Sequence, residues 1–359
     1  MRIGLVIYGT LDTISGGYLY DRKLVEYLRH AGDAVQIISL PFRNYAAHLS
    51  DNFSSDLLNR LRDARVDVLL QDELNHPSLF QLNRKLRVVA RAPIIAIVHH
   101  LRSSETHPAL QYLFYRWIER QYLARVGGFI FNINTTRDAV SQMLGGELTS
   151  FVVAHPAGNQ FDPQMDSAAI IQRARTRGAL RIAFIGNLIP RKGLHTLLDA
   201  LARLPRDAAT LTIIGNPNVD ARYTAQIREQ IKSLRLNNAR LVGAIQDDAL
   251  ANILSASHLL IVPSDYEGYG IVYLEGMSFG LPAIGTTSGA ASEIIANGVN
   301  GFLIAPNDAA MLAEHIATLQ RDRQLLAQMG CAARARYLEQ PRWDESMSRV
   351  RSFLLEARG

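Results

Sequence analysis

The sequence predicts an α/β protein built from two doubly wound domains, each a parallel sheet with helices on both faces. Short runs of aliphatic and β-branched residues recur along the chain, and amphipathic helical stretches separate most of them. The length of 359 residues exceeds what one ordinary hydrophobic core accommodates and suits two domains. The apolar runs also form two series with a break between them.

The apolar runs define the candidate strands. The first series contains Ile3–Tyr8, Ala34–Ile38, Val66–Gln71, Ile94–His99, Phe129–Asn132 and Ser150–Val153. The second contains Ile182–Ile185, Thr210–Gly215, Ala239–Val242, Leu259–Val262, Pro282–Gly285 and Gly301–Ile304. Helical stretches such as Leu19–His30, Leu57–Ala64 and Leu194–Leu204 lie between them. Continuous apolar strands that alternate with helices are typical of parallel sheets buried on both faces, so each series predicts one sheet.

The domain boundary is expected near Ala157–Asp166, where Gly158 and Pro163 interrupt the pattern and no periodicity continues. We therefore expect one domain over residues 1–160 and a second over 161–339. An amphipathic helix over Trp343–Ala357, within residues 340–359, is expected to return to the first domain. Ligands of open α/β sheets bind beyond the carboxyl ends of the strands, so a cleft between the two sheets is the expected active site.

Composition excludes several classes of protein. With 48% hydrophobic and 20% charged residues, the chain is neither disordered nor fibrous. The single cysteine, Cys331, excludes an internal disulfide and a Cys-based zinc site and favours a reducing compartment. No apolar run is long enough for a signal peptide or a membrane span, which predicts a cytoplasmic protein that could still touch the inner membrane surface. A net charge of +5 suits anionic partners, but no pattern typical of nucleic-acid binding is present.

The most informative segment is Pro263–Gly280, which reads PSDYEGYGIVYLEGMSFG and follows a candidate strand. It predicts a strand, a glycine-containing turn and a helix start, whose unpaired N–H groups suit a diphosphate. Gly268 and Gly270 would let a ligand approach the backbone. Glu267 and Glu275 supply carboxylates that accept hydrogen bonds from the hydroxyl groups of sugars and riboses.

This segment resembles glycosyltransferase family 4, a family of retaining enzymes with the GT-B fold of two Rossmann-like domains facing a central cleft. The resemblance rests on Glu-x7-Glu with Pro-Ser before it, Gly-x-Gly inside it, and SGAASEII and NGVNGFLI downstream. It implies that Glu267 holds hydroxyls of the donor sugar and Glu275 holds the nucleotide ribose. It is strong over Arg181–Ala310 and weak over residues 1–160, the half that reads the acceptor in this family.

A cationic clamp for the donor diphosphate is expected after the first strand of the second domain. Family members usually have Gly-Arg followed by Lys-Gly, and Lys192 and Gly193 match the second pair. Asn187 replaces the usual arginine. Arg191 could supply the missing charge or could point to solvent, and only an arginine offers a bidentate fork.

The first domain is expected to close on the donor with a glycine loop and a histidine. Ser15-Gly16-Gly17 resembles the glycine loop of the family, although an ordinary strand–helix turn would look the same. His99 ends a strand at the position where the family places a histidine near the donor sugar, and His100 faces the other way. The alternative for both is a structural histidine. No HExxH, Asp-x-Asp or facial-triad spacing occurs, so neither a metal nor a cofactor is expected.

The resemblance implies a retaining glycosyltransferase that moves a glucose- or mannose-type hexose from a UDP- or GDP-sugar to a hydroxyl acceptor, in polysaccharide, glycolipid or glycoconjugate synthesis. The expected catalytic residues are Glu267, His99 and Lys192. The expected donor-binding residues are Gly16, Gly17, Asn187, Arg191, Lys192, Glu267, Gly268, Tyr269, Gly270, Ile271 and Glu275. The alternatives are a sugar-nucleotide epimerase or a phosphorylase on the same fold, or a non-catalytic nucleotide-sugar-binding protein, which only the Asn187 departure supports.

One basic segment, Leu82–Arg91, contains Arg84, Lys85, Arg87 and Arg91 without an acid. Its interleaved apolar residues make it amphipathic. One interpretation is a helix on a membrane surface that serves a lipid-linked acceptor. The simpler interpretation is a solvated helix face.

Overall fold

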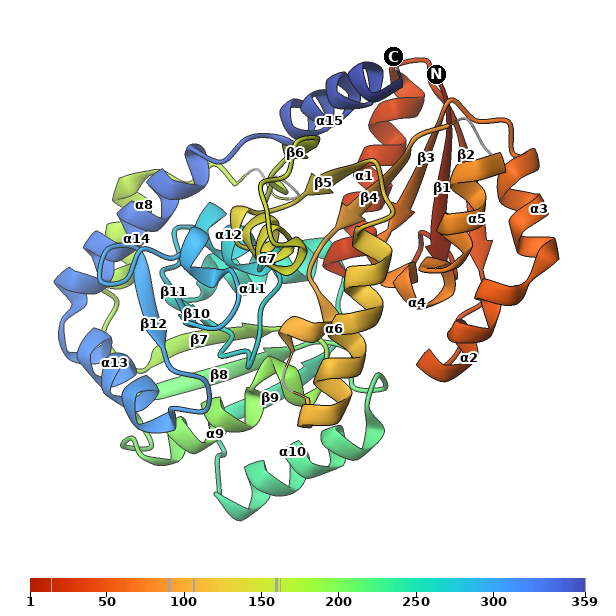
Figure 1. Ribbon diagram of the computed structural model, residues 1–359. Helices are drawn as coiled ribbons and strands as arrows, with labels where there is room; N and C mark the ends of the chain where they lie inside the picture. The colour runs from red at the N-terminus through yellow and green to blue at the C-terminus, as the bar shows by residue number, and fades with distance from the viewer. Residues whose placement is uncertain (14, 90–91, 106, 159–160, 162, 359) are drawn as a thin grey trace. The chain divides into compact units, whose positions relative to one another are not determined.

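The protein divides into two compact units (Figure 1). The computed structural model describes residues 1–13, 15–89, 92–105, 107–158, 161 and 163–358. Unit 1 comprises Met1–Pro156 and Pro341–Gly359, and unit 2 comprises Ala157–Gln340. The division falls before Ala157, whereas the sequence analysis expected it after residue 160. Residues 159, 160 and 162 of the expected linker lie outside the described part.

Unit 1 is built on a parallel sheet of six strands in the order β2-β1-β3-β4-β5-β6. The strands are β1 Arg2–Tyr8, β2 Ala34–Leu40, β3 Val68–Asp72, β4 Ile94–Val98, β5 Gly128–Phe131 and β6 Phe151–Val153. Every residue of β3, β4 and β5 is buried. This burial on both faces explains why their sequences are continuous apolar runs instead of alternating patterns.

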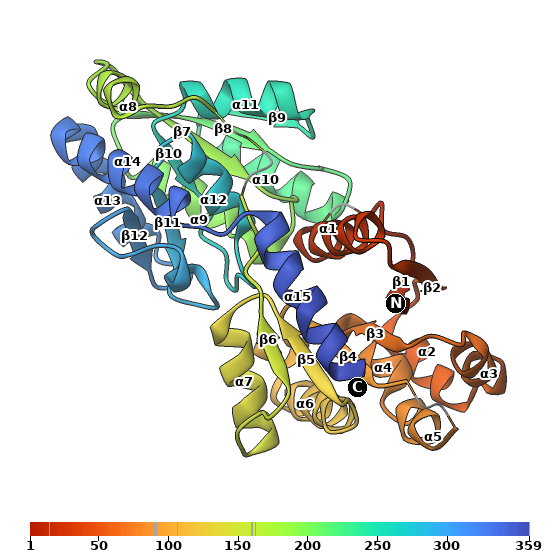
Figure 2. The same ribbon diagram turned by 90° about the horizontal axis from the view of Figure 1, so that it is seen from above.

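The helices of unit 1 cover both faces of this sheet (Figure 2). They are α1 Gly16–His30, α2 Tyr45–Leu49, α3 Ser55–Asp63, α4 His76–Leu79, α5 Leu82–Val89, α6 Ala109–Leu123, α7 Asn134–Leu144 and α15 Trp343–Arg358, with 3-10 turns η1 Ser50–Phe53, η2 Glu73–Asn75 and η3 Arg102–Ser104. Helices α3 to α7 bury one apolar cluster against the sheet. Helices α1 and α15 pack against each other. None of the helices in the described ranges has the length and apolar character needed to cross a membrane.

Helix α15 completes unit 1 although it follows unit 2 in the sequence. The Trp343 ring meets the Tyr20 ring of α1 edge-on, with 5.8 Å between centroids. The Ser346 hydroxyl donates to the carbonyl oxygen of His155 at 2.6 Å. Arg351 Nε donates to Asp33 Oδ2 at 2.7 Å, and Asp33 also accepts from the amino nitrogen of Met1. Apolar, hydrogen-bonded and ionic contacts therefore fix this helix.

We predict that Asp33→Asn destabilises the protein by about 2 kcal/mol at neutral pH. Burial alone would raise the pKa of Asp33, but Arg351 and the Met1 ammonium outweigh burial and lower it. A carboxyl whose pKa is depressed by folding contributes stability above its unfolded pKa and loses that contribution as the pH falls. Chemical denaturation measures the effect.

The matched control for this prediction is Glu26→Gln, which removes only the exposed pair of Lys23 with Glu26. Such surface pairs contribute about 0.5 kcal/mol or less. Equal losses in the two variants would show that Asp33 does not anchor α15.

Unit 2 repeats the architecture with a parallel sheet in the order β12-β11-β10-β7-β8-β9. The strands are β7 Leu180–Ile185, β8 Ala209–Ile214, β9 Ala239–Gly243, β10 Leu259–Ile261, β11 Ala283–Thr286 and β12 Gly301–Ile304. The helices are α8 Ser167–Ala174, α9 Leu194–Ala202, α10 Ala221–Ser233, α11 Asp247–Ala256, α12 Ile271–Ser278, α13 Ala309–Arg321 and α14 Arg323–Leu338, with turns η4 Pro190–Lys192 and η5 Ala291–Glu293. The predicted fold class of two doubly wound sheets is confirmed.

Candidate functional site

Each sheet has one point where the strand order reverses, and the expected site residues gather there. In unit 1 the reversal lies between β1 and β3, and in unit 2 between β7 and β10. Connections at such a point leave the carboxyl edge in opposite directions and open a crevice for a ligand. Gly16 and Gly17 follow β1, Lys192 follows β7, and Glu267 follows β10. The strand order thus gives each unit one half-site.

The half-site of unit 2 is centred on a buried ion pair. Lys192 Nζ donates to Glu267 Oε2 at 2.6 Å, and the Ser264 hydroxyl donates to the same oxygen at 3.0 Å. The Lys192 and Glu267 side chains are only 15% and 9% exposed. The structure therefore brings together two of the three expected catalytic residues, both of them on loops at the carboxyl edge of one sheet.

Two glycines allow the loops around this ion pair to approach so closely. Gly193 has φ +67°, and a Cβ there would lie 1.9 Å from the carbonyl oxygen of Pro263. Gly289 has φ +81°, and its Cβ would lie 2.2 Å from the carbonyl oxygen of Glu267. Both residues need a left-handed backbone and have no room for a side chain. In the Lys192-Gly193 pair, the lysine therefore supplies the charge and the glycine allows the close packing of the loop.

Arg191 lies in the half-site and does not point away from it. Its Nη1 donates to the carbonyl oxygen of Tyr266 at 2.8 Å, and its own carbonyl accepts from Asp265 N at 2.8 Å. Burial alone would raise the pKa of Glu267, but the charges of Lys192 and Arg191 and the hydrogen bonds to the carboxylate outweigh burial and lower it. Asn187, at the position of the usual arginine, is half-buried in the turn after β7.

Glu275 occupies a different electrostatic environment on α12. It lies in the second turn of the helix, which begins after Gly270 at φ +87°. Burial raises the pKa of Glu275 to about 7, and the charge of Asp247 adds to the shift. Among the described residues, no positively charged side chain contributes to this pKa shift. Near neutral pH this carboxyl therefore exists in both protonation states.

The remaining residues of the expected donor set differ in exposure. Tyr269 is 6% exposed, and its hydroxyl accepts a hydrogen bond from the Gln340 amide, so its side chain supports the turn from inside the unit. Gly268 and Ile271 are half-buried and leave backbone at the surface of the turn. The backbone of Glu267 is fixed by Ala290, whose N–H donates to the Glu267 carbonyl at 2.9 Å.

We predict that Glu275→Gln flattens the pH dependence of stability. A carboxyl whose folded-state pKa is raised above its unfolded value destabilises the fold as pH rises from the unfolded pKa to the folded one. Between pH 5 and pH 8 the free energy of unfolding of the wild type should fall by up to about 3 kcal/mol, because one pKa unit corresponds to about 1.4 kcal/mol. The Glu275→Gln variant should not show this fall. Chemical denaturation at both pH values measures the difference. Glu229→Gln, an exposed substitution on α10, is the control and should behave as the wild type.

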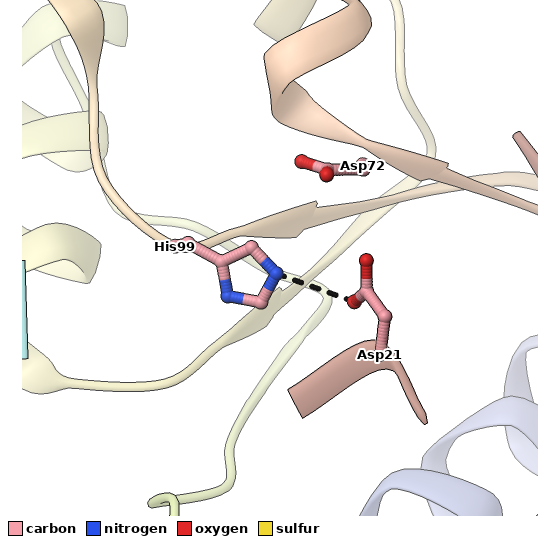
Figure 3. Close-up of side chains that lie close together, drawn as sticks. All are labelled: Asp21, Asp72 and His99. Atoms are coloured by element: carbon pink, nitrogen blue, oxygen red, sulfur yellow. Dashed lines mark hydrogen bonds and ion pairs between the residues drawn. The ribbon is translucent and has the colours of Figure 1, made fainter. Parts of the chain in front are cut away.

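The half-site of unit 1 is a buried cluster of His99, Asp21 and Asp72 (Figure 3). His99 follows β4, Asp72 ends β3, and Asp21 lies in the second turn of α1. His99 Nε2 lies 3.2 Å from Asp21 Oδ1. A Cβ added to Gly17 would lie 3.0 Å from His99 Cδ2, so the glycine loop packs directly on the imidazole. The Ser15 hydroxyl caps α1 by accepting from Tyr18 N.

The environment of the cluster shifts the pKa values of His99 and Asp72 upward. Burial alone would lower the pKa of His99, but the carboxyl groups of Asp21, Asp72 and Glu73 outweigh burial and raise it. Burial and the charge of Asp21 raise the pKa of Asp72 to about 7. Asp21 Oδ2 and His99 Nδ1 are buried without a hydrogen-bond partner in the described structure. The unpaired Nδ1 is the atom of His99 still available to a ligand.

Sequence analysis missed Asp21 and Asp72. Asp21 lies inside a helix four residues after Gly17, among residues that bury the apolar face of α1. An aspartate on the apolar face of a predicted helix could have revealed Asp21, because charged residues are almost never fully buried without a partner. Asp72 ends a wholly buried strand. Asp72 comes close to Asp21 and His99 only because β3 lies between β1 and β4. This strand order cannot be read directly from the sequence.

We predict that Asp21→Asn lowers the pKa of His99, because it removes the nearest carboxylate with little change in the volume of the side chain. Titration of the His99 ring by NMR measures the change. The same variant should lower the pKa of Asp72, which the Asp21 charge now raises. Asp56→Asn, an exposed substitution on α3, serves as the control. An unchanged His99 titration in Asp21→Asn would refute this electrostatic assignment.

A second buried cluster lies beside the first and comprises Glu73, His76 and Glu119. His76 Nε2 lies 2.9 Å from the Tyr45 hydroxyl, and His76 Nδ1 lies 3.0 Å from the Glu73 carbonyl oxygen. Burial raises the pKa of Glu73 to about 7 and lowers that of His76 to about 4. Both ring nitrogens of His76 thus have neighbours within the protein. His100, the other histidine after β4, lies 3.4 Å from Glu105 instead of joining either cluster.

Comparison with solved structures identifies the fold of the protein. Two solved structures share the fold over nearly the whole chain at less than 20% identity. Sucrose-phosphate synthase from Thermosynechococcus elongatus gives a TM-score of 0.81 at 18% identity and covers 99% of this chain and 98% of its own. HepE from Anabaena, in complex with UDP and glucose, gives 0.76 at 19% identity, with coverage of 99% and 100%. The fold is therefore GT-B.

The sequence comparisons show which proteins the chain is similar to. Residues 169–336 match the family model described as glycosyl transferases group 1. The chain is 25% identical to phosphatidyl-myo-inositol mannosyltransferase from Mycobacterium leprae over 98% of its own length and 95% of that protein. It is 32% identical to glycogen synthase from Mycobacterium tuberculosis over 48% of this chain and 41% of that one. The chain is therefore similar to group 1 glycosyltransferases, in sequence over residues 169–336 and in its GT-B fold over nearly its whole length.

Proposed function

We propose that the protein is a retaining hexosyltransferase that uses a UDP- or GDP-activated hexose of the glucose or mannose type and glycosylates a hydroxyl group in polysaccharide, glycolipid or glycoconjugate synthesis. The observation that carries this proposal is the buried ion pair of Lys192 and Glu267 beside the start of α12. HepE binds UDP and glucose, and the mycobacterial relative is a mannosyltransferase, which makes both donor classes reasonable.

The half-site of unit 2 provides the groups that such a donor requires. Lys192 and Arg191 supply two cations for a diphosphate. Glu267 stays ionised and can accept hydrogen bonds from sugar hydroxyls through its remaining lone pairs. Glu275 can accept from ribose hydroxyls, and the open backbone of Gly268 allows close approach. Tyr269 and Gly270 shape this turn, and we propose that they act on the donor only through it.

We propose that the anomeric configuration is retained. The acceptor oxygen forms a bond to the anomeric carbon while the bond from that carbon to the diphosphate oxygen breaks on the same face. The acceptor proton passes to the departing phosphate oxygen, so no separate base is required. His99, whose pKa is raised by its acidic neighbours, is proposed to stabilise negative charge on the donor when its ring is protonated. No metal ion takes part in this proposal, so a chelator should leave the rate unchanged.

The acceptor-free alternatives make distinct predictions. An epimerase would convert the donor without an acceptor, and a phosphorylase would require free phosphate. A non-catalytic binding protein would show neither transfer nor slow donor hydrolysis. We propose that Arg191, whose charge acts on Glu267, compensates for the arginine missing at Asn187, which would weaken the last alternative. We further propose a cytoplasmic location, at the inner membrane surface if the acceptor is lipid-linked.

We predict that Glu267→Ala lowers the transfer rate by at least about a hundredfold. The substitution removes the acceptor of the sugar hydroxyls and leaves the Lys192 ammonium without its buried partner. Radiolabelled transfer from UDP-glucose and GDP-mannose to a panel of acceptors measures the rate, after a thermal-shift screen has identified the donor that stabilises the protein. Glu229→Ala on α10 is the matched control. Full activity of a folded Glu267→Ala protein would defeat the proposal.

A further inference from the structure

Helix α6 of unit 1 carries an exposed apolar stripe. Leu110, Leu113, Phe114 and Trp117 are 84%, 59%, 44% and 51% exposed. Their spacing along α6 places them on one face of the helix. Scattered single apolar residues are ordinary at a protein surface, but a contiguous group marks an interaction surface.

The stripe is held in place by the aromatic residues beneath it. The Trp117 ring meets Phe80 edge-on with 5.9 Å between centroids, and the Phe114 ring meets Tyr45 in the same way at 6.2 Å. Phe80 itself is 8% exposed and belongs to the apolar core. Each outer ring is thus fixed on its inner side while much of its surface faces outward, so little ordering would be lost on binding.

Helix α5 also carries an exposed apolar residue. Helix α4 contacts both α5 and α6, so the three helices lie on the same part of unit 1 (Figure 2). Val88 at the end of α5 is 84% exposed. We call the surface formed by Val88, Leu110, Leu113, Phe114 and Trp117 the α5–α6 face.

Cations border the α5–α6 face, and exposed acids are absent from its two helices. Arg84, Lys85 and Arg87 are exposed on α5, and no salt bridge of the described residues includes them. Arg120 is exposed on α6. Glu119, the acid of α6, is buried and accepts from Ser103 N. Surfaces that bind anionic lipid typically combine apolar and aromatic side chains with flanking Arg and Lys residues.

We propose that the α5–α6 face docks on an anionic lipid bilayer, with Leu110, Leu113, Phe114 and Trp117 entering the headgroup–acyl boundary and the cations contacting lipid phosphate. A second copy of the chain fits this face less well. A two-fold interface would bring the like charges of α5 and α6 together, and these helices expose no acid to neutralise them. The expected basic segment Leu82–Arg91 is one part of this surface, and its Arg91 lies outside the described residues.

Docking on a bilayer specifies the acceptor class if the proposed function holds. Helix α6 follows β4, the strand that ends at His99, so the docked helix begins on the same edge of the sheet as the half-site. An acceptor whose lipid part stays in the bilayer would present its hydroxyl group near that edge. The docking itself does not depend on the chemistry and is tested separately.

Vesicle binding tests the proposal, and Trp117 reports on it directly. The chain contains two tryptophans, and Trp343 is only 7% exposed. Vesicles with equal parts of phosphatidylglycerol and phosphatidylcholine should shift the tryptophan emission to the blue, and acyl-brominated lipids should quench it. Trp117→Phe should abolish both signals while the protein still sediments with the vesicles. Phosphatidylcholine alone, or high salt, should bind at least about tenfold more weakly.

The decisive variant is Leu110→Glu with Leu113→Glu, which should weaken partitioning by at least about tenfold without changing the thermal shift given by nucleotide sugars. The control, Val219→Glu with Val299→Glu, alters two exposed apolar residues of unit 2 and should bind as the wild type. Unchanged vesicle binding of the Leu110→Glu/Leu113→Glu protein would overturn the proposal. So would a dimer that this variant converts to a monomer in sedimentation velocity. Loss of the donor thermal shift in the wild type would count against the proposed function alone.

Discussion

The structure of unit 2 depends on one interaction, the ion pair between Lys192 and Glu267 at 2.6 Å. Two charges this deeply buried are tolerated only when each neutralises the other, since an unpaired buried charge is strongly destabilising. The pair therefore fixes the loop after β7 against the loop after β10. Positions 193 and 289 must be glycine in this arrangement, because the neighbouring backbones are so close that they leave no space for a Cβ.

The protein separates the protonation states of its carboxyl groups by environment. Glu267 is kept ionised by neighbouring cations, whereas burial without such cations raises the pKa of Glu275 to about 7. In unit 1 the arrangement is reversed, because acids surround a histidine and raise its pKa. Shifts in opposite directions within a few residues of a sheet edge are typical of functional sites.

Much of this could be read from the sequence. The strand β12 was predicted residue for residue, and β10 and β11 to within one residue, because continuous apolar runs between glycines and prolines leave few alternatives. Glu267 and Lys192 were recognisable because their spacing within local motifs reflects the loops that carry them. Such motifs lie in short stretches of chain and need no knowledge of the tertiary structure.

What the sequence did not reveal depends on pairings across the fold. Asp21 and Asp72 are 51 positions apart in numbering and meet His99 only because β3 lies between β1 and β4. The direction of Arg191 depends on where the Tyr266 carbonyl lies. The exposed stripe of α6 was also missed, because its helix is apolar on more than one side and only packing decides which side is buried. Each of these is a property of neighbours in space.

The return of α15 to unit 1 has a consequence for synthesis. Residues 341–358 leave the ribosome only after all of unit 2 has been made, yet they supply Trp343 and Arg351 to the first unit. While unit 2 is translated, the surface of α1 that later contacts α15 therefore remains exposed. Completion of unit 1 is thus coupled to completion of unit 2.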